Sequence, residues 1–309
     1  MGGECLRAKG SCRESACKIG REGGCDMDKN KLDLVEGLNY STIQIDFECE
    51  DGRRGSGTGF FVNLEPDSET HRKMLALVTN KHVVRDAKRL TLVFTLQKGG
   101  APQVGKKYRL SLDDFRPLWV FHPDEKVDLC ALQIGLAVSY AKMTAGVDLM
   151  IKSFERSQIA DKGVLSEFVQ TDDVFMIGYP CGIRDEVNNQ PIFRRGSLAT
   201  NPQYDFRGDP DFLIDMPVYP GSSGSPVVGV HSGLQVYEGN PCVMDPSFRD
   251  VKLLGVVHHT MLAGRKIQEL PVDNHEREIV TIPNNLGIVV KADRILELEP
   301  LFGHQLKKA

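Results

Sequence analysis

Three serines stand close together in the stretch VYPGSSGSPVV, which runs from Val218 to Val228: Ser222, Ser223 and Ser225. A serine hydroxyl becomes a nucleophile when a histidine takes its proton and a carboxylate holds that histidine in one tautomer. Backbone N–H groups must also face the oxyanion that develops. A nucleophilic serine in this stretch therefore predicts one histidine and one aspartate in suitable positions elsewhere in the chain.

Two upstream segments supply these partners. His82 lies in LALVTNKHVV, just where a strand would deliver a side chain to the end of a barrel, and GSGTGFFV places small residues near that end. Asp128 is the last polar residue before the apolar run of VDLCALQI, where a carboxylate can be shielded from water and still bond to a histidine. Asp124 and Glu125 have instead the pattern of a charged turn. The residue types predict His82 as the base and Asp128 as the acid that orients it.

Short apolar and β-branched runs separated by turn residues make up most of the chain from about Asn39 onward. The first set is STIQIDFE, GTGFFVNL, MLALVTN, LTLVFTL and LCALQIG, and the second is DVFMIGYP, FRRGSLAT, DFLIDMPV, SPVVGV, KLLGVVHHT and NLGIVVK. This spacing predicts an all-β barrel or sandwich. The segment from Ala137 to about Asp161 contains VDLMIKSFERSQIA, has mixed helical character and is expected to connect the two sets. The stretch ADRILELEPL predicts a short C-terminal helix.

In this order and spacing, the pieces resemble the chymotrypsin-fold (trypsin-like) serine peptidases, and among them the bacterial branch with HtrA-type and glutamyl-endopeptidase-type protease domains. The pieces that carry the resemblance are GSGTGFFV, LVTNKHVV, VDLCAL, VFMIGYP, IDMPVYPGSSGSPVV, LLGVV and LGIVV with its helix. The resemblance covers roughly Asn39 to Leu301, and no PDZ domain fits after it. It implies two antiparallel β-barrels and a serine endopeptidase that acts on protein or peptide substrates through an acyl-enzyme.

The resemblance also implies a division of the chain. The expected units are a cysteine-containing extension over residues 1–38, a first β-barrel with His82 and Asp128 over 39–150, a connector and second β-barrel with Ser223 and the C-terminal helix over 151–301, and a tail over 302–309. The loops 232–250 and 261–283 are long for a compact domain, and such loops are often functional or disordered.

The family pattern Gly-x-Ser-Gly-[Gly/Ser]-Pro falls on residues 221–226 and sets the register of the serine loop. It implies that Ser223 is the nucleophile and that the backbone N–H groups of Gly221 and Ser223 form the oxyanion hole. Ser222 stands where activated trypsins carry the aspartate that pairs with a newly cut N-terminus. Trypsin-style activation of a zymogen is therefore not expected.

The sequence indicates candidate residues for substrate specificity but not a specific substrate side chain. In the family the strand after LLG lines the S1 pocket, which makes Val257, His258, His259 and Thr260 candidate pocket or edge residues. A histidine there would favour an acidic substrate side chain, but the glutamyl endopeptidases carry theirs one residue earlier, where this chain has Val257. Pro217 stands where trypsin has its acidic pocket residue, so a preference for Arg or Lys has no visible basis.

Other chemistry is not favoured, and neither a metal nor a cofactor is expected. The stretch GSGTG lacks the following helix of a dinucleotide-binding loop, because FFVNL continues as a strand. A metallohydrolase using His258 and His259 is disfavoured because adjacent residues on a strand point to opposite faces. The paired Arg194 and Arg195 are interpreted as a solvated or ion-paired strand edge.

Composition narrows the partners and the compartment. The formal net charge of −4 does not point to nucleic acid, and the absence of an 18-residue apolar run argues against a membrane span. The start of the chain has no apolar signal-peptide core, and eight cysteines fit a reducing, cytoplasmic compartment. The four N-terminal cysteines lack C-x2-C spacing and are interpreted as free thiols of a flexible tail, with a metal site as the alternative: Cys5, Cys12, Cys17 and Cys25. Cys130 is expected to be buried.

Two alternatives to a constitutively active enzyme stay open. The same fold can serve as a pseudo-protease, a dormant module that binds peptides or partners. An enzyme held off until a regulatory protein partner binds lies between the two.

Overall fold

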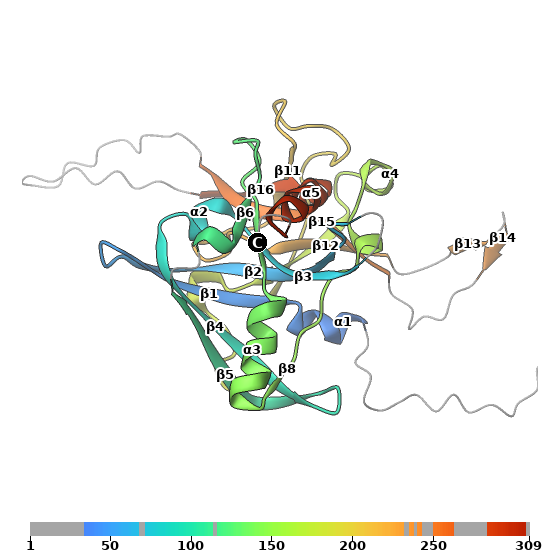
Figure 1. The fold of residues 1–309 in the computed structure, drawn as a ribbon. Helices are drawn as coiled ribbons and strands as arrows, with labels where there is room; N and C mark the ends of the chain where they lie inside the picture. The colour runs from blue at the N-terminus through green and yellow to red at the C-terminus, as the bar shows by residue number, and fades with distance from the viewer. Residues whose placement is uncertain are drawn as a thin grey trace, which may run out of the picture.

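The computed structural model describes residues 34–67, 72–113, 116–231, 235–237, 240–242, 250–262 and 283–306. Strands dominate, and Figure 1 shows them in two groups, with β1 to β5 below and β11, β12, β15 and β16 above. The chain enters the first group through α1 (Leu34–Gly37) and η1 (Leu38–Tyr40). The expected cysteine-bearing tail lies outside the described residues.

The first unit is an antiparallel sheet in the order β5-β4-β1-β2-β3-β7-β6, with β8 paired to β4. Its strands are β1 (Thr42–Cys49), β2 (Arg54–Leu64), β3 (Met74–Thr79), β4 (Ala87–Lys98), β5 (Ala101–Asp113), β6 (Trp119–Phe121), β7 (Cys130–Gln133) and β8 (Asp148–Leu149). The path is open, with β5 at one end and β6 at the other, and β4 and β5 form a long hairpin whose second strand is mostly exposed. Figure 1 shows this hairpin extending away from the rest of the molecule beside α3 (Gly135–Ala145).

The second unit is a closed antiparallel barrel in the order β10-β11-β16-β15-β12-β9. Its strands are β9 (Asp173–Gly178), β10 (Ile192–Leu198), β11 (Asp211–Asp215), β12 (Pro226–His231), β15 (Asp250–Leu262) and β16 (Pro283–Lys291). The separate pair β13 (Gln235–Tyr237) and β14 (Asn240–Cys242) lies within the long 232–250 loop, and the rest of that loop and most of 261–283 fall outside the described residues.

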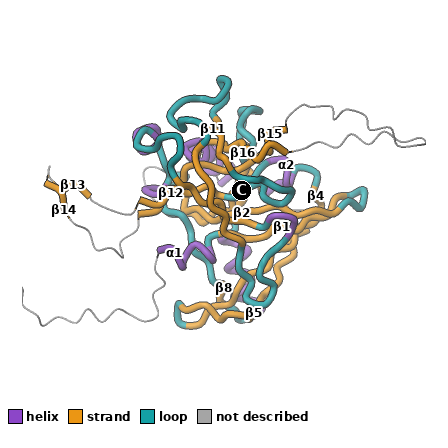
Figure 2. The backbone as a smooth tube through the Cα atoms, turned by 180° about the vertical axis from the view of Figure 1, so that it is seen from behind, coloured by secondary structure: helices purple, strands orange, loops and turns teal. Residues whose placement is uncertain are grey.

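Short helical turns connect and close these units. They are α2 (Lys81–Val84), η2 (Arg116–Leu118), η3 (Arg156–Gln158), α4 (Lys162–Leu165), η4 (Pro180–Gly182), η5 (Ala292–Leu298) and α5 (Glu299–Leu306). Figure 2 shows the molecule from behind, with the helices in purple and the strands in orange. The predicted C-terminal helix is confirmed, although its first half is 3-10 and its second half extends past residue 301. Phe302 is almost fully buried, which explains why the helix continues into the expected tail.

The prediction of helical character in VDLMIKSFERSQIA is wrong for most of that stretch. The helix of this region is α3, which precedes it and ends at Gly146 in the left-handed conformation (φ 67°). The chain then pairs with the first sheet, where the N–H of Met150 donates to the carbonyl of Thr95 and that of Phe154 to the carbonyl of Phe61. These tertiary backbone pairings outweigh the local helical pattern.

A single apolar core joins the two units. It contains residues of the first sheet, of the second barrel and of the C-terminal helices, among them Phe60, Val78, Leu129, Ile177, Val228, Leu253, Val290, Ile295 and Phe302. Two further clusters fill the interior of the first sheet and of the second barrel. The all-β prediction, with two antiparallel units, a connector and a C-terminal helix, is confirmed. The described helices include none that is both long and apolar enough to cross a membrane.

Candidate active site

The serine loop connects β11 to β12 and depends on two glycines in the left-handed region. Gly221 has φ 88° and Gly224 has φ 87°. A Cβ atom at position 221 would lie 2.5 Å from the carbonyl oxygen of Tyr179, and one at position 224 would overlap the carbonyl oxygen of Thr58. Both positions therefore require glycine for conformation and for space.

Thr58 on β2 fixes this loop from the other unit. Its N–H donates to the carbonyl of Ser223 at 2.8 Å, and its hydroxyl donates to the carbonyl of Gly221 at 2.9 Å. On the opposite side, the N–H of Gly224 donates to the carbonyl of Val257 on β15 at 2.8 Å. The loop is thus held between the two units by hydrogen bonds to its own backbone, none of which involves the Ser223 side chain.

His82 and Asp128 lie together on the first unit. His82 is on α2 directly after β3, and Asp128 precedes β7, which pairs with β3. The Asp128 carboxylate accepts the His82 backbone N–H at 3.2 Å and lies 2.5 Å from His82 Nδ1. The Asn80 side chain donates to the Asp128 carbonyl at 2.8 Å. An ionised carboxylate only accepts, so Nδ1 carries the proton and Nε2 keeps a free lone pair.

The charge of Asp128 is set by two opposing effects. Burial raises the pKa of this carboxyl, but the hydrogen bonds and charge of His82 outweigh burial and leave the pKa below its usual value. Asp128 is therefore ionised at neutral pH. Its side chain is 16% exposed, whereas that of His82 is 42% exposed. The pair consequently has a shielded carboxylate and an imidazole that solvent and ligands can reach.

Ser223 comes from the second unit and faces this region. Its hydroxyl donates to the carbonyl of His258 at 3.4 Å, and no hydrogen bond joins it to His82 in the described part of the chain. Contacts between a nucleophile and its base are often loose until substrate binds. Within the same described residues, neither the N–H of Gly221 nor that of Ser223 has an acceptor, so both are free to donate to a ligand.

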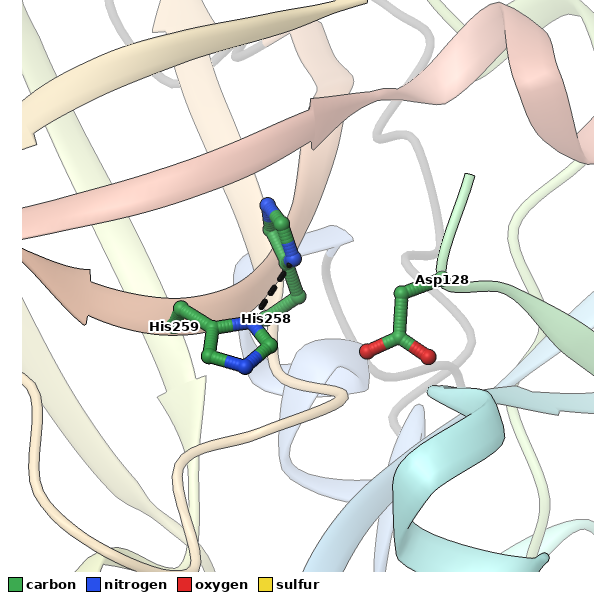
Figure 3. A group of neighbouring side chains, drawn as sticks. All are labelled: Asp128, His258 and His259. Atoms are coloured by element: carbon green, nitrogen blue, oxygen red, sulfur yellow. Dashed lines mark hydrogen bonds between the residues drawn. The ribbon is translucent and has the colours of Figure 1, made fainter. Parts of the chain in front are cut away.

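The two adjacent histidines on β15 point to the same side, and the expectation that they lie on opposite faces is wrong. On β15, Val257 pairs with Val289 of β16, and the next pair is His259 with Ile288. The pairing therefore skips His258. His258 is the extra residue of this β-bulge, and a bulge interrupts the alternation of side chains. The two Nδ1 atoms lie 2.9 Å apart, with the rings 4.8 Å apart between centroids (Figure 3).

These histidines contact the His82–Asp128 pair. One ligand atom each of Asp128, His258 and His259 lie within 4.8 Å of one another, and the rings of His82 and His259 are 5.3 Å apart. The pKa of His259 is lowered by partial burial, and further by the imidazoles of His258 and His82, so its neutral form is favoured. Four ionisable groups thus converge at this site: the predicted His82–Asp128 pair and the two histidines that the sequence placed in or at the edge of a substrate pocket.

The other predicted pocket residues lie in different surroundings. Val257 is fully buried in the core of the second barrel, so only its backbone reaches the serine loop. Thr260 donates its hydroxyl to the carbonyl of Val218 at 2.9 Å. The carbonyl of Pro217 accepts from Arg194 at 2.5 Å, and that guanidinium lies 5.2 Å from the centre of the Tyr219 ring.

The two arginines of FRRGSLAT differ from each other. Arg195 forms an exposed ion pair with Asp173 at 2.5 Å, as expected of a strand edge. Arg194 is partly buried beside Pro217 and does not fit that interpretation. Cys130 is fully buried, as expected, and burial raises the pKa of its thiol. The three cysteines described with their side chains are free thiols: Cys49, Cys130 and Cys181.

Thr58, Asn80 and Asp211 contribute to the site but were not indicated by sequence reasoning. Thr58 is the threonine of GSGTG, where the sequence showed only small residues beside a strand. Asn80 lies two residues before His82, where its amide bonds the backbone of Asp128. Asp211 is 7% exposed, and its carboxylate lies 3.4 Å from His258 Nε2. Only a three-dimensional contact reveals these partners.

Residues 57–234 match the family of trypsin-like peptidase domains, which is more than half of the chain. The chain therefore belongs to this family, and its two antiparallel β units agree with the chymotrypsin-like fold that the resemblance implied. No curated protein matches it.

The solved structures that are similar to the chain include three proteases. The HtrA-type protease AlgW, solved with a tripeptide, is 13% identical with a TM-score of 0.45; 87% of this chain and 63% of AlgW are covered. The Rv3671c protease of M. tuberculosis in its active form is 18% identical with a TM-score of 0.39, covering 84% of this chain and 80% of that one. Deg5 is 15% identical with a TM-score of 0.40, covering 76% and 87%. The chain thus spans less than two thirds of AlgW, and the family assignment depends on the sequence match.

Proposed function

We propose that the protein is a serine endopeptidase in which His82, Asp128 and Ser223 form a catalytic triad. The observation that carries the proposal is the His82–Asp128 pair, in which the carboxylate bonds Nδ1 and leaves Nε2 free on an imidazole that is 42% exposed. The free N–H groups of Gly221 and Ser223 support the accompanying oxyanion hole. The substrates are proteins or peptides, as the family implies.

The proposed reaction has two halves. His82 Nε2 takes the proton of Ser223 as its Oγ attacks the carbonyl carbon of a peptide bond, and Asp128 stabilises the imidazolium that forms. The N–H groups of Gly221 and Ser223 donate to the oxyanion. His82 then gives the proton to the leaving amine, which leaves an ester on Ser223. A water molecule, deprotonated by His82, hydrolyses this acyl-enzyme and returns the free serine.

Labelling with a fluorophosphonate tests the nucleophile. We expect the probe to phosphonylate the wild-type chain at Ser223 with loss of fluoride, and Ser223→Ala to abolish labelling. Ser222→Ala is the matched control, because Ser222 is fully buried and its hydroxyl has no hydrogen-bond partner among the described residues. Labelling that persists in Ser223→Ala would refute the assignment.

One observation favours a second candidate, the dormant pseudo-protease that binds peptides or partners. The Ser223 hydroxyl bonds the carbonyl of His258, not the imidazole of His82. A wild-type chain that stays unlabelled when alone would favour this candidate. Labelling that appears only on addition of a binding protein would instead support an enzyme regulated by a partner.

The proposal also covers the organisation of the chain. It keeps the units 39–150 and 151–301, with the triad divided between them, an extension over 1–38 and a tail over 302–309. It assigns the edge of the substrate site to Pro217, Thr260 and the two histidines of β15. A cytoplasmic location remains part of the proposal, supported by the cysteine content, and cell fractionation tests it.

A further inference from the structure

We propose that Asp128, His258 and His259 bind a zinc-class divalent cation beside His82, and that the bound ion holds the peptidase inactive. The argument for cation binding uses the geometry of the three side chains and does not depend on the proposed catalytic function. The inhibitory effect rests on the proposed function of His82 as the catalytic base.

The donor atoms have the separation and chemistry that zinc requires. The Nδ1 atoms of His258 and His259 are 2.9 Å apart, against roughly 3.3 Å between two imidazole nitrogens on a tetrahedral zinc with Zn–N bonds of about 2.0–2.1 Å. The Asp128 carboxylate faces both rings (Figure 3), and all three ligand atoms lie within 4.8 Å. Two imidazoles and one carboxylate suit zinc and leave a fourth position for water.

Asp211 supplies the outer partner that a metal-bound histidine needs. Its Oδ2 lies 3.4 Å from His258 Nε2, and the two side chains are 9% and 11% exposed. Within the described contacts, His258 Nε2 and Asp211 Oδ1 are buried without a hydrogen bond. Metal-binding imidazoles almost always donate their second ring N–H to a carboxylate or carbonyl. A proton on Nε2 directed at Asp211 would leave Nδ1 of His258 free to bind the cation.

The β-bulge makes this arrangement available on a strand. Regular alternation would separate His258 from His259, but the shifted pairing with β16 turns both rings toward Asp128. His259 is exposed and His258 and Asp128 are partly exposed, so the ion can reach the site from solvent.

A cation at this position would oppose catalysis by competing with His82 for the Asp128 carboxylate. Both oxygens of Asp128 bond His82, so the ion would draw on the negative charge that stabilises the imidazolium. The ring of His259, one of its ligands, already contacts the ring of His82. A carboxylate shared with a cation no longer holds His82 in the tautomer that accepts the proton of Ser223, so the nucleophile loses its oriented base.

Binding is tested on the full chain carrying Ser223→Ala. Zn²⁺ alone is titrated by calorimetry, and Co²⁺ alone by visible absorption, which reports the coordination directly. We expect one ion with a tetrahedral nitrogen–oxygen spectrum. Adding His259→Ala should weaken this site by at least the 10- to 100-fold that loss of even an outer partner causes. Adding His82→Ala, the matched control, should leave the site intact because His82 is not a donor.

Cysteine sites elsewhere in the chain are distinguished by their thiolate-to-cobalt absorption and by their persistence in His259→Ala. Circular dichroism confirms that each variant is folded. If folded His258→Ala and His259→Ala chains bind both ions as tightly as the parent, the site is refuted. The two histidines are then only a hydrogen-bonded pair.

Inhibition is tested with Ser223 intact by comparing fluorophosphonate labelling with zinc and with a chelator. We expect zinc, at the concentration that saturates the site, to suppress labelling at least 10-fold and the chelator to restore it. In His259→Ala, the labelling rate with zinc should stay close to the labelling rate with the chelator. Equal labelling of wild type in both conditions would overturn the inhibitory role. A wild type unlabelled without metal would overturn that role together with the proposed function, while the titration still decides whether the site exists.

Discussion

Asp128 is the residue on which the chemistry of the site depends. It receives two hydrogen bonds from His82, and Asn80 bonds its backbone carbonyl. It also faces the imidazoles of β15 (Figure 3). A carboxylate in this position selects the tautomer of His82 and stabilises its cation, and both effects need a full negative charge.

Replacing Asp128 by asparagine should therefore remove activity without removing the fold. An amide of nearly the same shape can donate to Nδ1 and favour the wrong tautomer, and we expect kcat to fall about 10⁴-fold. Asp124→Asn, an exposed neighbour, is the control and should leave kcat unchanged. The rate of fluorophosphonate labelling and the melting temperature measure the two effects separately. A loss of labelling in Asp128→Asn below 10-fold would contradict the orienting role.

At the scale of single residues, the sequence indicated His82, Asp128 and Ser223 because each has a distinctive local context. A polar residue at the end of an apolar run or a serine among glycines can be recognised along the chain. The contacts of Thr58 and Asp211 involve residues far away in the sequence, so no local pattern marks them. The prediction that His258 and His259 point to opposite faces was wrong for the same reason. The strand looks regular in the sequence, and its bulge arises from pairing with β16.

Among the elements, the loop between β11 and β12 is the most constrained. Its shape needs left-handed backbone at two positions, and at Gly224 a side chain would also overlap Thr58. Gly208 has nearly the same φ, 82°, but no atom within 4 Å of its missing side chain. Substitution of Gly208 therefore tests conformational strain alone, whereas substitution of Gly224 tests strain together with crowding.

We expect Gly208→Ala to lower the free energy of unfolding by about 1–2 kcal/mol, the strain of a left-handed alanine, and to leave labelling intact. Gly224→Ala adds the overlap to this strain, so it should destabilise the protein more and abolish labelling. Denaturant unfolding and the probe measure both. Equal destabilisation by the two substitutions would contradict the crowding at Gly224.

The element pattern was well predicted where strands are buried and regularly spaced, and less well in the connector. The helix α3 ends at Gly146, and the following chain is drawn into pairing with the first sheet. That sheet is an open path that ends in the long, mostly exposed β5, and short apolar runs in the sequence do not reveal such a strand.

In the whole molecule, the site lies where the two units meet above a shared apolar core. Thr58 connects them: it bonds the carbonyls of Gly221 and Ser223, and its hydroxyl accepts the N–H of Tyr179 at 3.2 Å. Correct geometry of the serine loop therefore depends on the docking of both units.

Thr58→Val keeps the shape of the side chain but leaves the buried carbonyl of Gly221 and N–H of Tyr179 without the hydroxyl. We expect a loss of about 1–3 kcal/mol of stability and at least a 10-fold slower labelling, because the loop loses its support. Thr58→Ser keeps the hydroxyl and should label at near the wild-type rate. If valine and serine variants label equally fast, the hydroxyl does not position the loop.

The bulge in β15 has a consequence for changes in chain length. The extra residue at His258 lets two neighbouring imidazoles share a face, so deleting a single residue there would restore regular alternation between Val257 and Thr260 and turn one imidazole away from Asp128. A one-residue insertion would move the bulge and have a similar effect. A substitution of either histidine changes one side chain and keeps the pairing of the strand, whereas a deletion or insertion changes the face to which its neighbours point.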